Sequence, residues 1–267
     1  MIRHVFLIAL LCFVTAAGAQ DDVAHVPAED LKLGGNEKQR YFLIGQVPKN
    51  PPKEGLGLLI ILPGGDGSAE FHPFVKRIYA NALPENYLVA QLVAVPSKNP
   101  NQVVWPTAKW PDAKQTFTTE DFIWAVAAEV KAKHPIDEQR VFTLSWSSGG
   151  PAAYAASLAT DTPVKGSLVA MSVFLPAKLP PLTAAKGQRY FLLQSPDDQV
   201  TKYFFAKTAK AQLTKHGAQV ELLDYPGGHG WHGDVFGNIR AGIGWLEAER
   251  APEPTTGPAP ASGLKAH

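Results

Sequence analysis

The chain has almost no cysteine and no excess of charge of either sign. Its 267 residues contain one cysteine, and 25 Lys and Arg offset 24 Asp and Glu to give a formal net charge of +1. The cysteine, Cys12, lies near the N-terminus, so we expect neither a disulfide nor a reactive thiol in the mature protein. The near-zero charge gives no electrostatic reason to expect binding to nucleic acid or to an anionic membrane. A core of apolar side chains must therefore hold the fold together.

The apolar run near the N-terminus is too short for a transmembrane helix, which needs roughly 20 residues. Arg3 and His4 precede apolar residues 5–14, and the small residues Ala17-Gly18-Ala19 follow. This order is typical of a secretory signal peptide. We expect cleavage after Ala19, no stable membrane insertion afterwards, and a mature protein that is periplasmic or secreted from a bacterium.

Length and composition favour one domain. With 45% apolar content, residues 20–250 are enough for one well-buried core. Residues 251–267 are rich in proline and poor in bulky apolar groups, so they cannot bury enough surface to offset their ordering entropy. We expect them to form a disordered tail.

Strand-like and helix-like segments alternate along the chain. This alternation predicts an α/β fold with a mostly parallel central sheet and helices on both faces. In such a sheet, ligands bind in the loops that follow the strands. Strands are expected at 41–47, 58–62, 88–93, 140–144, 167–171, 189–194 and 219–225, and helices at 70–82, 119–134, 151–159, 201–216 and 235–250.

The segment after the strand at 140–144 has the features of a turn that presents a serine nucleophile. It reads Ser145-Trp-Ser-Ser-Gly149, and Pro151 then suits the first turn of a helix. A tight strand-to-helix turn brings the residues two before and two after Ser147 close together, so both must be small. The N-terminus of the following helix would favour negative charge developing at Ser147.

Two later loops supply an acid and a base in the order that a serine hydrolase with this arrangement needs. The strand at 189–194 runs into Ser195-Pro-Asp-Asp, where Asp198 is our candidate acid and Asp197 the reserve. The strand at 219–225 runs into Pro226-Gly-Gly-His-Gly, which exposes His229, our candidate general base.

An upstream glycine-rich loop is expected to bind an oxyanion. The apolar run 57–62 ends in Pro63-Gly64-Gly65-Asp66-Gly67, where glycine lets the backbone approach a substrate closely. The N–H groups of Gly65 and Ser148 are the expected donors, and Asp66 is a candidate for substrate binding.

Together these four motifs resemble those of α/β-hydrolases of the carboxylesterase, phospholipase and dienelactone-hydrolase type, in secreted bacterial form. The resemblance covers about residues 40–248. It implies an α/β-hydrolase fold, a triad of Ser147, Asp198 and His229, no cofactor, and a carboxylic ester substrate that is a small molecule or is linked to a polymer. Departures from the family pattern are Ser at 145 and 195, where glycine is usual, and Pro63, where histidine is usual.

Alternatives remain open. A peptidase of the same fold uses the same triad, and a catalytically inactive hydrolase fold can serve as a binding protein. His229, His232 and Asp234 are an alternative metal cluster, although glycines at 227, 228, 230 and 233 argue against a helix there, and we expect no metal. His232 is instead expected to cap or lead into the last helix. Trp146 and Trp231 flank the candidate catalytic groups and are expected either to line a substrate pocket or to pack in the core.

Overall fold

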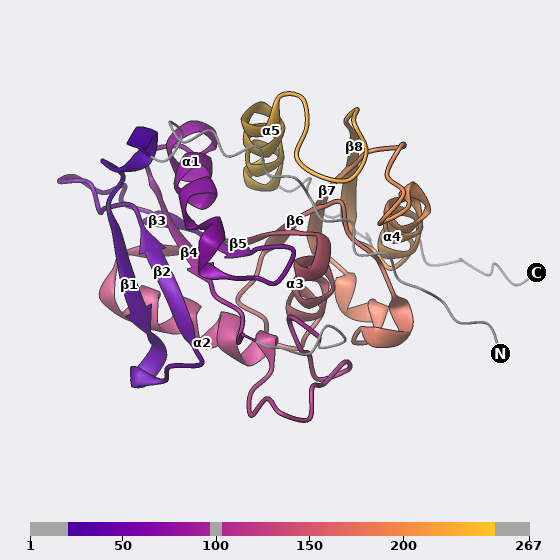
Figure 1. Cartoon of the computed structure of the whole chain (residues 1–267), viewed down its shortest axis with the longest axis horizontal. Coiled ribbons are helices and arrows are strands. Elements are labelled where there is room, and N and C mark those ends of the chain that lie inside the picture. Colours follow the sequence, from indigo (N-terminus) through magenta and orange to yellow (C-terminus); the bar gives the residue numbers. More distant parts are fainter. Residues whose placement is uncertain (1–20, 97–102, 249–267) are drawn as a thin grey trace, which may run out of the picture.

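A computed structural model describes residues 21–96 and 103–248. The predicted signal peptide and the predicted C-terminal tail lie outside the described residues. The chain forms one eight-stranded sheet in the order β1-β2-β4-β3-β5-β6-β7-β8 (Figure 1). The strands are β1 (Ala28–Lys32), β2 (Arg40–Ile44), β3 (Leu56–Leu62), β4 (Tyr87–Leu92), β5 (Ile136–Trp146), β6 (Gly166–Ala170), β7 (Arg189–Gln194) and β8 (Gln219–Asp224).

The strands from β4 to β8 in the sheet order are parallel, whereas β2 pairs antiparallel with both β1 and β4. The predicted mostly parallel sheet is therefore confirmed. The sequence prediction missed β1, because its residues, Ala-Glu-Asp-Leu-Lys, are largely polar and exposed. Backbone pairing with β2 and a two-bond ion pair from Arg40 to Asp30 hold this edge strand.

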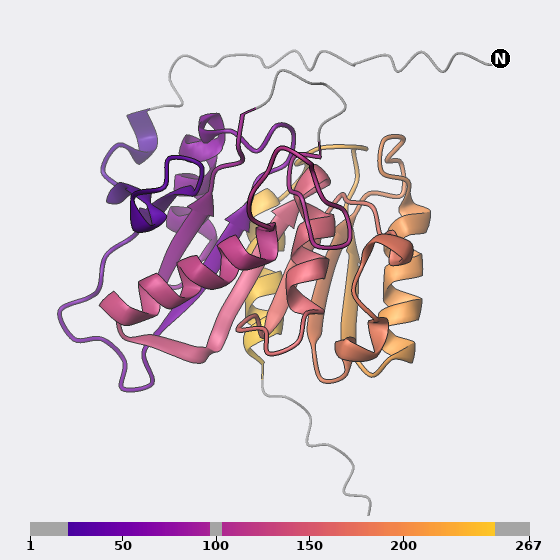
Figure 2. The ribbon, with the colours of Figure 1, turned by 90° about the horizontal axis from the view of Figure 1, so that it is seen from below.

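Helices cover both faces of the sheet. On one face lie α1 (His72–Ala82) and α5 (Val235–Glu247), and on the other lie α2 (Thr119–Lys133), α3 (Gly150–Ser157) and α4 (Tyr203–Lys215). In Figure 2, α2, α3 and α4 lie in front of the sheet and α5 behind it. The sequence predicted all five helices, with ends that differ by a few residues.

The helix starts follow from local chemistry. Thr118 accepts from the Asp121 N–H while the Asp121 carboxylate accepts from the Thr118 N–H, so α2 begins with a capping box. At the start of α5, Asp234 is the N-cap, and its side chain accepts from the Gly237 N–H. Asp has the short acceptor side chain that this position prefers. Of the two roles expected for His232, capping is therefore wrong, and the residue lies in the segment that leads into the helix.

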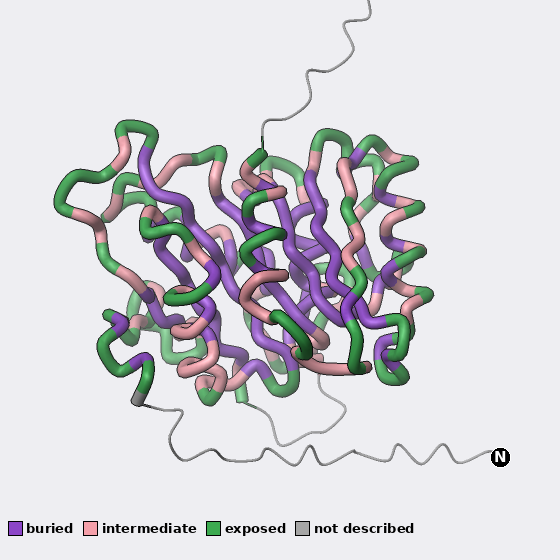
Figure 3. The backbone as a smooth tube through the Cα atoms, turned by 90° about the horizontal axis from the view of Figure 1, so that it is seen from above, coloured by how far each residue is buried: buried purple, intermediate pink, exposed green. Residues whose placement is uncertain are grey.

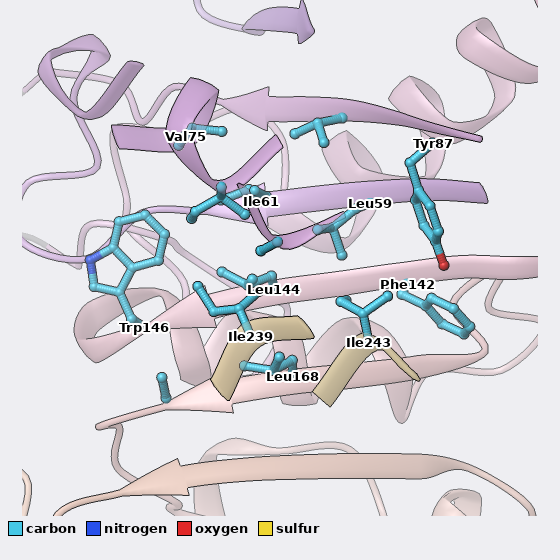
Figure 4. Close-up of a cluster of buried hydrophobic side chains, with 14 of the residues drawn as sticks. Leu59, Ile61, Val75, Tyr87, Phe142, Leu144, Trp146, Leu168, Ile239 and Ile243 are labelled. Carbon is cyan, nitrogen blue, oxygen red and sulfur yellow. The ribbon is translucent and has the colours of Figure 1, made fainter. Parts of the chain in front are cut away.

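The central strands are buried on both faces, which explains their continuous apolar sequences (Figure 3). Leu59 and Ile61 of β3 pack in the cluster that contains Val75 of α1 and Ile239 and Ile243 of α5 (Figure 4). Their neighbours in β3 point the other way, into the cluster that contains the apolar face of α2. In residues 21–96 and 103–248, no helix is long and apolar enough to cross a membrane.

Candidate active site

Four loops meet at the carboxyl edge of the sheet. They follow β3, β5, β7 and β8, which all run parallel, so the ends of these strands point to the same edge. The predicted site residues lie on these loops, except Trp146, which is the last residue of β5. The sheet therefore brings together side chains that are far apart in the sequence.

The turn after β5 is strained and closely packed. Ser147 has a φ of +49°, a left-handed conformation that non-glycine residues rarely adopt. A Cβ at Gly149 would lie 2.4 Å from the carbonyl oxygen of Leu62 in β3, so only glycine fits there. Ser172, after β6, donates a hydrogen bond of 2.7 Å to the Ser147 carbonyl oxygen. These contacts hold the backbone of Ser147 in one position.

Three predicted side chains form one hydrogen-bonded chain. The Ser147 hydroxyl oxygen lies 3.2 Å from His229 Nε2, and His229 Nδ1 lies 2.9 Å from Asp198 Oδ2. Asp198 is 2% exposed, whereas Ser147 and His229 are half-buried. Asp197 is exposed, and its N–H donates to the Ser195 hydroxyl. The structure thus places Asp198, and not the reserve Asp197, against His229.

The Asp198 carboxylate accepts five hydrogen bonds from protein groups. Its Oδ1 accepts from the N–H groups of Val200 and Thr201, and its Oδ2 accepts from the Thr201 hydroxyl, the Gln194 amide and His229. Burial raises the pKa of Asp198, but the hydrogen bonds from His229, Thr201 and the backbone outweigh it and hold the pKa below its ordinary value. The group is therefore charged at neutral pH.

This lowered pKa predicts a loss of stability in acid. Because the folded pKa lies below the unfolded value of about 3.9, the contribution of Asp198 is complete above that value. It is lost as the pH falls further, through the folded pKa. We expect the free energy of unfolding of the wild type to fall below pH 4 more steeply than that of Asp198→Asn. Urea unfolding of both proteins at several pH values between about 2 and 6 measures the difference. Equal slopes for the two would contradict this.

The glycine-rich loop lies against the strained turn. Gly64 is in close contact with Trp146, and the Ser148 hydroxyl donates to the Gly65 carbonyl oxygen at 2.8 Å. Asp66 is exposed, and its carboxylate accepts from the Ser68 N–H. Gly65, Asp66 and Ser148 are therefore neighbours at the edge of the site. Their roles in binding an oxyanion or a substrate stay a prediction.

The two predicted tryptophans belong to an aromatic cluster. Trp146 is 5% exposed, and its ring packs edge-on against Trp231, Phe71 and Phe74 at centroid distances of 5.5 to 5.8 Å. Figure 4 shows the Trp146 indole beside Ile61 and Leu144 at one end of the core. Trp231 is half-buried and also contacts Phe74. Trp146 thus fills the core beneath the site, and Trp231 is the member of the pair with surface left for a substrate.

The alternative metal cluster has no support in the geometry. His229 faces Ser147 and Asp198, and Asp234 caps α5. In the part of the chain that the structure describes, no three His, Cys, Asp or Glu side chains are grouped so that they could hold a metal ion.

Comparison with solved structures identifies the fold. A carboxylesterase from Mesorhizobium loti aligns with a TM-score of 0.60 at 16% identity, over 83% of this chain and 99% of that one. A putative dienelactone hydrolase from Klebsiella pneumoniae aligns with a TM-score of 0.64 at 17% identity, over 84% and 99%. A fluorophosphonate-binding serine hydrolase from Staphylococcus aureus aligns with a TM-score of 0.62 at 13% identity, over 83% and 98%. The chain has the α/β-hydrolase fold. A scan against family models and a search of curated proteins found no match.

Within this α/β-hydrolase fold, two residues that hold the Asp198 carboxylate were missed by sequence reasoning. Gln194, the last residue of β7, donates to Asp198 Oδ2 and to the Thr201 carbonyl oxygen. Thr201 donates to Asp198 and lies 3.3 Å from His229 Nδ1. The spacing Asp-x-x-Thr, in which a side chain caps the N–H groups two and three residues on, was a local signal for Thr201. Nothing in the sequence around Gln194 indicated its role.

Proposed function

We propose that this protein is a secreted serine esterase, which cleaves a carboxylic ester through an acyl-enzyme on Ser147. The observation that carries the proposal is the hydrogen-bonded chain from Ser147 through His229 to Asp198. In this chain a serine in left-handed conformation faces an imidazole whose other nitrogen contacts a buried carboxylate, which is the arrangement that activates a serine nucleophile. The solved carboxylesterases with this fold are consistent with the proposal.

The geometry suits acyl transfer in two steps. His229 Nε2 accepts the Ser147 proton as the hydroxyl oxygen attacks the ester carbonyl carbon, while Asp198 holds the imidazole and stabilises its charged form. The tetrahedral intermediate collapses, and His229 returns the proton to the leaving alcohol. Water, deprotonated by His229, then attacks the acyl carbon. His229 returns this proton to the Ser147 oxygen as the acyl–oxygen bond breaks, which releases the carboxylic acid and regenerates the Ser147 hydroxyl.

The negative charge of the tetrahedral oxygen needs donors beside Ser147. The N–H groups of Gly65 and Ser148 are our proposed donors, since their two loops are in contact next to the Ser147 hydroxyl. A 3-10 turn (Ser147–Gly149) leads from Ser147 into α3, whose start adds the positive end of a helix dipole. Secretion is proposed on the signal-peptide pattern of residues 1–19.

A panel of p-nitrophenyl esters of graded acyl length, with a feruloyl ester and an acetylated sugar, tests this function. We expect turnover of at least one short acyl ester and a preference among the others that defines the acyl site. Peptide p-nitroanilides tested alongside separate the esterase from a peptidase of the same fold. Cleavage of peptides with no ester turnover would contradict the esterase assignment, and no turnover of either class by folded protein would favour a binding role.

A further inference from the structure

The Ser148 side chain joins two loops that the fold brings together at the site. Its hydroxyl donates a 2.8 Å hydrogen bond to the carbonyl oxygen of Gly65. Ser148 follows the candidate nucleophile directly, and Gly65 belongs to the glycine-rich loop after β3. A backbone N–H at position 148 exists whatever the side chain is. The hydroxyl therefore has an effect that can be separated from that of the N–H.

Gly65 occupies the first central position of a tight turn. The Gly67 N–H donates to the Gly64 carbonyl oxygen at 3.0 Å, and Gly65 has a φ of +60°. Among the described non-glycine residues, positive φ occurs at Ser147, Asp161 and Met171, so Asp66 has a negative φ. A positive φ at the first central residue only defines a type II′ turn.

The central peptide of this turn, between Gly65 and Asp66, has a second accessible orientation. Rotating it by about 180° converts type II′ to type I′, which needs a positive φ at the second central residue. Asp adopts that conformation more readily than most residues, so the sequence does not exclude it. The Ser148 bond favours the observed orientation, since it holds the Gly65 carbonyl toward the Ser147 turn.

Other contacts fix the two ends of the loop, and the Ser148 hydroxyl holds the peptide between Gly65 and Asp66. Trp105 donates from its indole to the Pro63 carbonyl oxygen at 2.9 Å, and the Ala94 N–H donates to the Gly67 carbonyl oxygen at 2.9 Å. Gly65 itself is exposed, and the nearest atoms to a Cβ there would belong to the Phe71 ring at 3.4 Å. Gly65 and Asp66 are both exposed, so the peptide between them lies at the surface of the loop.

We propose that Ser148 is a positioning residue, whose hydroxyl fixes the Gly65–Asp66 peptide and so holds the Gly64–Gly67 turn against the Ser147 turn. The Gly65 N–H, which belongs to the adjacent peptide of the same turn, is then kept in place for the developing oxyanion. The inference rests on the proposed esterase function and adds a role for this side chain to it. A pre-set donor stabilises the transition state, and a substrate carbonyl in the ground state gains less from it. Loss of the hydroxyl therefore lowers kcat and leaves KM nearly unchanged.

The test compares Ser148→Ala, Ser148→Thr and Thr162→Val with the wild type on the best ester of the panel. We expect kcat to fall about tenfold in Ser148→Ala, equivalent to about 1.4 kcal/mol, with KM within about twofold. Ser148→Thr keeps a hydroxyl donor and should retain activity within about threefold of wild type. Thr162→Val removes a hydroxyl that accepts from the Val164 N–H away from the site, and should not change kcat.

A second measurement separates positioning from a general structural effect. A trifluoromethyl ketone, which forms a tetrahedral adduct with a serine nucleophile, should bind Ser148→Ala more weakly by the same factor as kcat. The pH profile should be unchanged, because the Ser147, His229 and Asp198 contacts do not involve the Ser148 side chain. If Ser148→Ala does not fold, Ser148→Cys, whose thiol is a weak donor, takes its place.

The outcomes distinguish this inference from the proposed function. An active wild type with wild-type kcat and ketone affinity in Ser148→Ala would overturn the role of the hydroxyl and leave the esterase in place. An equal loss of kcat in Ser148→Thr would also overturn it. A wild type that neither turns over esters nor binds the ketone overturns both proposals.

Discussion

Replacing Ser147 with alanine should lower kcat for ester hydrolysis by about 10⁴-fold or more. The hydroxyl oxygen of Ser147 is the only atom of that side chain that can attack a carbonyl, and it lies 3.2 Å from His229 Nε2. Alanine leaves the N–H donors and the substrate surface intact, so any remaining activity reports binding and oxyanion stabilisation alone. Steady-state kinetics on the preferred p-nitrophenyl ester measure the loss.

The fold should tolerate this change. Ser147 is half-buried and keeps its φ of +49° because Ser172 and the close approach of Gly149 to β3 hold the backbone. None of these contacts uses the Ser147 side chain. The melting temperature of Ser147→Ala should stay within a few degrees of wild type. A folded variant with wild-type kcat would show that Ser147 is not the nucleophile.

The second large effect is expected for Asp198→Asn, which should lower kcat by roughly 10³ to 10⁴-fold. Asparagine replaces one acceptor oxygen with an NH₂ donor, which must face either His229 or the N–H groups of Val200 and Thr201. In either case the hydrogen-bond network around position 198 loses partners. The imidazole then loses the negative charge that stabilises its protonated form.

Asp197→Asn is the matched control. Asp197 is adjacent in sequence and carries the same charge, but its side chain is exposed, and the carboxylate that contacts His229 is that of Asp198. The kcat of Asp197→Asn should stay within about twofold of the wild-type value. A large loss of kcat in Asp197→Asn, with little loss in Asp198→Asn, would show that Asp197 and not Asp198 is the acid.

The central strands and the helices were predictable because their sequences carry local signals of burial and of helix starts. A strand such as β3, buried on both faces, has a continuous apolar sequence, and α2 begins with a capping box that can be recognised without coordinates. The edge strand β1 has neither signal. Its Ala-Glu-Asp-Leu-Lys sequence becomes a strand through pairing with β2, which local propensity does not reveal.

For the candidate site, the sequence allowed the loops that form it to be predicted, but not all of the contacts between their side chains. Ser147, Asp198 and His229 each follow a strand, in a loop rich in glycine, proline or serine, and parallel strands bring such loops to one edge. The choice of Asp198 over Asp197 depends on side-chain direction, which the structure provides. The Ser148 contact joins two loops that are far apart in the sequence, and the Gln194 contact belongs to no recognised local motif. No sequence pattern therefore indicated either contact.

Labelling with a fluorophosphonate, followed by peptide mass spectrometry, shows directly whether Ser147 is an activated nucleophile. A fluorophosphonate reacts with a serine whose hydroxyl is activated by a neighbouring base. We expect one adduct, on Ser147, and no adduct in Ser147→Ala. A folded wild-type protein that takes up no label, or that carries the label on a different residue, would contradict the assignment of Ser147 as the nucleophile.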